Sequence, residues 1–91
     1  MKYTVKLEKG ARKTLEKLDK PTRNLILGWL ARNLEGCENP RDWGKSLKGS
    51  YSGMWRYRIG DWRVLAQIVD EEVQILIIKI GHRREIYRDK S

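Results

Sequence analysis

The stretch WRYRIGDWRVLAQIVDEEVQILIIKI, residues 55–80, decides the fold. Apolar and polar side chains alternate along residues 55–59, the dipeptide Gly60–Asp61 indicates a two-residue hairpin loop, and residues 62–69 form the return strand. A second turn over residues 70–72 leads into residues 73–80, which are almost all apolar, as expected of a strand that is buried on both faces. The stretch therefore predicts three consecutive antiparallel strands.

The residues ahead of this stretch predict one further strand and two helices. Residues 2–8 alternate like a half-buried strand, and from Lys9 the apolar residues change to a helical spacing. Pro21 fits the first turn of a second helix, and EGCENP at residues 35–40 ends it. Residues 36–53 are rich in Gly, Ser, Asn and Pro and predict a loop. In the second helix we expect a shared apolar face made of Leu27, Leu30, Ala31 and Leu34, with Ile26 and Trp29 beside it.

The order β-α-α-β-β-β predicts an α+β fold. Two N-terminal helices should pack on one face of a mostly antiparallel four-stranded sheet. A length of 91 residues suits one domain, so we expect residues 1–91 to form a single domain.

The composition predicts a cytoplasmic protein with a polyanionic partner. The net charge of +8 favours nucleic acid or an acidic protein. Cys37 is the chain's one cysteine, which excludes an internal disulfide and a cysteine zinc site and suits a reducing compartment. No targeting segment or apolar run of membrane-spanning length is present, and no motif indicates a metal or another cofactor.

The turn lengths predict how the three strands pair. A two-residue loop at Gly60–Asp61 places Arg58 opposite Arg63. A three-residue loop over residues 70–72 places Lys79 opposite Arg63 and turns Leu76 and Ile78 toward the core, whereas a two-residue loop would bury Lys79. We therefore expect the three-residue loop.

This pairing predicts a row of cations on the face of the sheet away from the helices. The row consists of Arg58, Arg63 and Lys79, with Arg56 two residues along. Like charges directly opposite each other destabilise a sheet unless an anion lies over them. A solvated basic face is the simpler alternative.

The segment GHRREIY, residues 81–87, begins where this row ends and favours a site. Arginines bind phosphate bidentately, and His82 and Tyr87 can exchange protons. Cations, a histidine and a tyrosine without a carboxylate suit cleavage of RNA by its own 2′-hydroxyl, a reaction that needs alignment and charge stabilisation.

The run LKGSYSGMWRYRIGDWRVLAQIVDEEVQILIIKIGHRREIY, residues 47–87, resembles the C-terminal half of the RelE toxins of type II toxin–antitoxin pairs. The resemblance implies a metal-independent, ribosome-dependent endoribonuclease that cuts mRNA in the A site, contacts 16S rRNA and is held inactive in a complex with an acidic antitoxin. It implies that Arg56, Arg58, Arg63, Arg83 and Tyr87 are catalytic. His82 lies where some relatives have a functional basic residue, and we expect Lys79, Arg84 and Lys48 to bind RNA.

One departure from the RelE pattern concerns the base that would take the 2′-hydroxyl proton. Some members have lysines where this chain has Arg56 and Arg58, and an arginine stays protonated. We expect Tyr87 to stack on a base or to protonate the leaving oxygen, and His82 to be the weaker candidate for the base. Two alternatives remain: a ParE-like inhibitor of DNA gyrase, which shares the fold, and a non-catalytic basic module that binds RNA or a protein partner.

Overall fold

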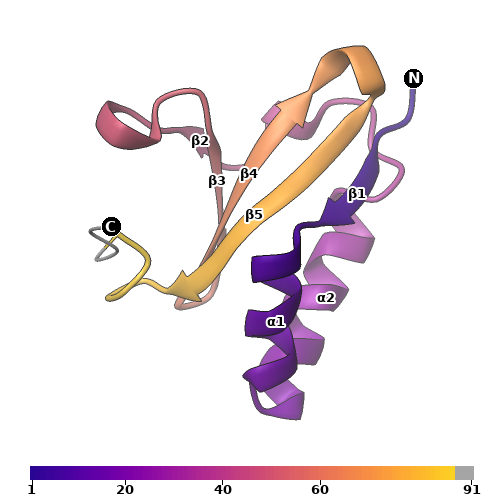
Figure 1. The fold of residues 1–91 in the computed structure, drawn as a ribbon. Helices are drawn as coiled ribbons and strands as arrows, with labels where there is room; N and C mark the ends of the chain where they lie inside the picture. The colour runs from indigo at the N-terminus through magenta and orange to yellow at the C-terminus, as the bar shows by residue number, and fades with distance from the viewer. Residues whose placement is uncertain (88–91) are drawn as a thin grey trace.

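The computed structural model describes residues 1–87, in which two helices cover one face of a twisted sheet (Figure 1). The regular elements are β1 (Thr4–Leu7), α1 (Lys9–Lys17), α2 (Lys20–Asn33), β2 (Lys45–Ser46), β3 (Trp55–Ile59), β4 (Trp62–Val69) and β5 (Gln74–His82). Within the described residues the strands form one sheet in the order β1-β5-β4-β3-β2. β1 is parallel to β5 and the other pairs are antiparallel, so the predicted α+β class and element types are confirmed.

The prediction of four strands is wrong, because part of the expected loop forms a fifth. β2 has only two residues, and Lys45 and Ser46 pair with Arg56 and Trp55 of β3. Gly44 precedes β2 with φ of +74°, and a Cβ atom at this position would collide with the carbonyl oxygen of Arg56. A glycine is therefore needed where the loop meets the sheet.

The two helices bury one face each against the sheet. Ala11 and Leu15 of α1 and Ile26 and Leu30 of α2 are buried, and Pro21 lies in the first turn of α2 as predicted. The predicted face of α2 is partly wrong: Leu30 and Leu34 are buried, but Leu27 and Ala31 are exposed. No helix in the described part of the chain is long and apolar enough to cross a membrane.

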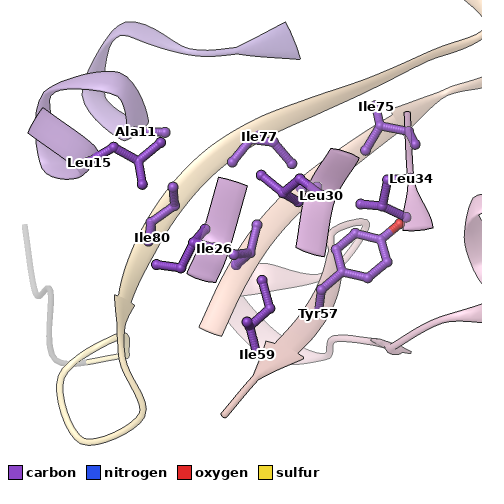
Figure 2. Close-up of a cluster of buried hydrophobic side chains, with 12 residues drawn as sticks. Ala11, Leu15, Ile26, Leu30, Leu34, Tyr57, Ile59, Ile75, Ile77 and Ile80 are labelled. Carbon is purple, nitrogen blue, oxygen red and sulfur yellow. The ribbon is translucent and has the colours of Figure 1, made fainter. Parts of the chain in front are cut away.

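The core lies between the helices and the sheet (Figure 2). Side chains of both helices meet side chains from β3 and β5, and β4 completes the cluster from the middle of the sheet. The buried residues of this cluster are Ala11, Leu15, Ile26, Leu30, Leu34, Tyr57, Ile59, Val64, Ala66, Ile75, Ile77 and Ile80. This packing fixes which face of each strand remains for other contacts.

The turn between β4 and β5 differs from the prediction. It holds four residues, because Val69 pairs with Gln74 and Val73 takes a left-handed conformation with φ of 51°. A bulge then leaves Ile78 unpaired between the pairs that β5 makes with Leu65 and Ala66. The expectation that Leu76 and Ile78 face the core is therefore wrong: Ile75, Ile77 and Ile80 do so.

Asp70 in this turn ties three distant segments together. Its carboxylate accepts a hydrogen bond from the Tyr3 hydroxyl at 2.6 Å and two from the Arg41 guanidinium at 3.1 Å each. The bonds from Arg41, and then the bond from Tyr3, hold the pKa of Asp70 below its ordinary value. The contact fastens the N-terminus and the loop after α2 to the end of the sheet.

Candidate functional site

Two strands carry the arginines of the candidate site. Tyr57 and Val64 point into the core, so their chain neighbours point to the opposite face of the sheet. We call this surface, made of Arg56, Arg58 and Arg63, the arginine face. The predicted pairing of Arg58 with Arg63 is confirmed.

The predicted pairing of Arg63 with Lys79 is wrong. Arg63 lies opposite Gly81, and Lys79 lies opposite Leu65. The longer turn and the bulge each shift the register by one residue in the same direction. A shift of two residues preserves the side of the sheet, so half-buried Lys79 remains on the arginine face, two residue pairs away from its predicted place.

Arg63 is the charged residue at the centre of the face, and it is only 9% exposed. Its Nη1 donates to the carbonyl oxygens of Gly60 and Trp62, at 2.9 and 3.0 Å. Burial, and then the positive charges of three neighbouring arginines, lower the pKa of Arg63 from its ordinary value. These neighbours, in decreasing order of effect, are Arg58, Arg56 and Arg83. An arginine remains protonated at neutral pH, so the face holds several fixed positive charges that a bound anion would offset.

Arg56 has a donor without a partner. Its Nε is buried and makes no hydrogen bond to any described residue. Lys45 of β2 lies directly opposite Arg56, so it adds a cation on the same side of the sheet. Sequence reasoning missed Lys45, because a two-residue strand has no apolar alternation to reveal it.

The segment after β5 leaves the sheet on the side away from the helices (Figure 1). The Arg83 backbone N–H donates to the Asp61 carbonyl oxygen at 2.8 Å, and Arg83 Nε lies 3.6 Å from Asp61 Oδ1. Asp61 of the hairpin loop therefore places one carboxylate beside Arg83 at this edge. The Tyr87 ring packs edge-on against Tyr51, with 5.3 Å between ring centroids, and Tyr51 is a second residue that sequence reasoning missed.

His82 is not brought to the arginine face. It pairs with Trp62, which packs against the core on the helix side, and the two rings meet at 5.6 Å. Its Nδ1 accepts a hydrogen bond from the Arg84 backbone N–H at 3.2 Å. The side chain therefore stabilises the turn after β5 and does not face Arg63.

The remaining predicted RNA-binding residues lie at the edges of the site. Lys48 directly precedes a 3-10 turn, Gly49–Tyr51, and Arg84 lies in the turn after β5; both are exposed. Among residues 1–87, no three His, Cys, Asp or Glu side chains gather where they could hold a metal ion.

Comparison with known proteins places the chain in a family. Residues 5–87 match the family described as the ParE toxin of type II toxin–antitoxin systems, parDE. The chain belongs to the RelE/ParE superfamily of toxins. This toxin is 32% identical to Toxin RelG of Mycobacterium tuberculosis over 88 residues, which cover 97% of this chain and 99% of RelG.

Solved structures share the fold of this toxin. The toxin–antitoxin complex RelBE2 of M. tuberculosis contains a chain that is 27% identical, with a TM-score of 0.79 over 91% of this toxin and 93% of that chain. The archaeal RelE–RelB complex of Pyrococcus horikoshii OT3 contains one that is 31% identical, with a TM-score of 0.70 over 91% of this toxin and 97% of that chain. The predicted resemblance to RelE toxins is therefore confirmed.

Proposed function

We propose that this toxin is a metal-independent, ribosome-dependent endoribonuclease that cuts mRNA in the A site and so inhibits translation. The observation that carries the proposal is the nearly buried Arg63, with Arg58, Arg56 and Arg83 close enough to lower its pKa and Tyr87 beside them. Preorganised cations of this kind stabilise the charge that develops on a phosphate during reaction.

The reaction needs little chemistry from the protein. The RNA 2′-oxygen attacks the adjacent phosphorus and loses its proton, while the bond from phosphorus to the 5′-oxygen breaks and that oxygen gains a proton. The products are a 2′,3′-cyclic phosphate and a 5′-hydroxyl. The arginine face would bind the phosphate oxygens, and Tyr87 would stack on a base or protonate the leaving oxygen. His82 faces away from Arg63, which weakens its candidacy as the base and leaves alignment and charge stabilisation as the main contributions.

The partners follow from charge and from the relatives. A net charge of +8 suits binding to mRNA and 16S rRNA, with Lys79, Arg84 and Lys48 as further contacts. Two related toxins were solved as complexes with their antitoxins. We propose a cognate acidic antitoxin that forms a heteromeric complex with this toxin in the cytoplasm.

Purified ribosomes that carry a defined mRNA test the proposal. Wild-type toxin should cut the mRNA within the A-site codon, and mRNA without ribosomes should stay intact. Arg58→Ala should reduce cutting by about 10²-fold, as for loss of one preorganised charge donor. Arg12→Ala is the matched control, because Arg12 is an exposed arginine on α1, away from the arginine face. Equal loss in both variants would show that net charge matters and the site does not.

A second function, inhibition of DNA gyrase, is favoured by the family match to ParE toxins. A supercoiling assay with purified gyrase distinguishes the two. Inhibition of gyrase without cleavage of ribosome-bound mRNA would replace the first proposal with the second.

A further inference from the structure

Two apolar side chains are buried outside the core between the helices and the sheet. Leu65 and Ile86 are fully buried, yet neither belongs to the core between the helices and the sheet. Leu65 lies between Val64 and Ala66, which do belong to that core, so its side chain points to the opposite face. Leu65 therefore lies on the side of the sheet that carries the arginines, and Gly81, which pairs with Arg63, faces the same side.

Ile86 sits over Gly81, the cross-strand partner of Arg63. A Cβ atom added to Gly81 would lie 3.0 Å from Ile86 Cδ1, 3.5 Å from its Cα and 3.6 Å from its Cβ. Gly81 does not have a positive φ, so its backbone conformation does not require glycine. A methyl group at position 81 would instead press on the end of the Ile86 side chain, which would have to move by a few tenths of an ångström.

The turn that carries Ile86 is held at several points. The backbone N–H groups of Glu85 and Ile86 both donate to the His82 carbonyl oxygen, at 2.8 and 2.9 Å. Ile86 is the buried side chain of this turn, and the next residue, Tyr87, packs on Tyr51. The place of Tyr87 beside the arginines therefore depends on the apolar seat one residue earlier.

We propose that Gly81 and Ile86 are positioning residues: the bare strand at Gly81 forms a seat for Ile86, and this contact sets the place of Tyr87 over the arginine face. The expected effect on kcat rests on the proposed cleavage of RNA, whereas the contact between Gly81 and Ile86 is tested in the toxin alone. Neither residue touches the substrate. A shift of about 1 Å at a reacting group is enough to lower a rate by about 10²-fold.

The experiment is a double-mutant cycle that uses the shape of the contact. Gly81→Ala adds the Cβ that would press on Ile86 Cδ1, and Ile86→Val removes that Cδ1 atom. Gly81→Ala should lower kcat on ribosome-bound mRNA by about 10- to 100-fold with KM within about twofold. Ile86→Val alone should have an effect below about threefold, and the double variant should recover most of the lost kcat, because the two changes relieve each other. Gly10→Ala is the matched control, since nothing lies within 4 Å of a Cβ there.

The second readout is the NMR contact between the rings of Tyr51 and Tyr87 in the toxin alone. It should be weakened in Gly81→Ala and restored in the double variant. If wild-type toxin cuts no mRNA while these ring contacts behave as stated, the cleavage proposal fails and the positioning role stands. If the ring contacts and kcat are both unchanged in Gly81→Ala, the positioning role is overturned. Should Gly81→Ala fail to fold, Ile86→Ala serves instead, and unchanged ring contacts in that variant overturn the inference.

Discussion

Replacement of Arg63 by alanine separates its electrostatic role from its structural role. Two effects on stability oppose each other. Arg63 Nη1 donates to two hairpin carbonyl oxygens, at 2.9 and 3.0 Å, and hydrogen bonds to a charged group contribute about 1.5–3 kcal/mol each when fully buried. Gly60 is exposed, so water can replace the bond to its carbonyl and only part of this contribution is lost. Removal of the Arg63 charge also ends its repulsion with Arg58, directly opposite, which stabilises the fold by about 0.2–1 kcal/mol.

The balance predicts that Arg63→Ala lowers the free energy of unfolding by about 1 kcal/mol at low salt. Salt screens the repulsion among the arginines of the folded wild type, so the stability gap between wild type and variant should widen as ionic strength rises. Cleavage of ribosome-bound mRNA should fall by about 10²-fold or more. Arg63→Lys should recover only part of the activity, because lysine keeps the positive charge but lacks the paired N–H donors with which a guanidinium binds phosphate.

Urea unfolding at 20 and 500 mM salt, together with single-turnover cleavage, measures both effects. A stability gap that narrows with salt would mean that Arg63 makes favourable ion pairs and is not held among like charges. An unstable variant with normal cleavage would make Arg63 a structural residue only.

Three further predictions concern the surroundings of the site. Gly44→Ala should lower the free energy of unfolding by about 4 kcal/mol or more. Gly36→Ala is the control, because Gly36 also has a positive φ of +80° but a Cβ there would have no atom within 4 Å, and it should lower the free energy of unfolding by only about 1–2 kcal/mol. Equal losses of stability in thermal unfolding would argue against a collision between residue 44 and β3. Asp70→Asn should lower stability above pH 3.8 and approach the wild type as pH falls below it, because a carboxyl whose pKa is lowered on folding stabilises only when ionised; a gap that persists to pH 2 would contradict this. Tyr87→Phe should reduce cleavage if the hydroxyl donates a proton, and His82→Gln should leave the rate within about threefold because His82 faces the other way; a silent Tyr87→Phe with an inactive His82→Gln would reverse the two assignments.

The sequence predicted the β3–β4 hairpin residue by residue because two constraints agreed there. A two-residue loop and a clean alternation of apolar residues allow only one pairing of Arg58. Neither constraint held at the next turn. Val73 in a left-handed conformation lengthened the loop, and a β-branched residue is a rare choice for that conformation. The bulge at Ile78 lies in an all-apolar run, where alternation carries no signal.

The candidate site was predicted in part for the same reasons. Residues on β3 and β4 were assigned to the correct face, and Lys79 kept its face because two register errors added to an even number. His82 was misassigned because residues 81–87 were expected to leave the sheet, whereas β5 continues through His82 and turns its side chain to the helix side. Tyr51 lies in a 3-10 turn and Ile86 in the turn after β5, and such irregular segments show no periodic pattern in the sequence.

The most direct test of the account is the chemistry of the ends left on ribosome-bound mRNA. Purified wild-type toxin should leave a 2′,3′-cyclic phosphate on the upstream fragment and a 5′-hydroxyl on the downstream fragment. A message with a single 2′-deoxy nucleotide at the cut position should stay whole, because the attacking oxygen is missing. Cleavage of that deoxy message, or a 5′-phosphate on the downstream fragment, would contradict the proposed mechanism. An intact wild-type message with supercoiling by gyrase inhibited would contradict the proposed function.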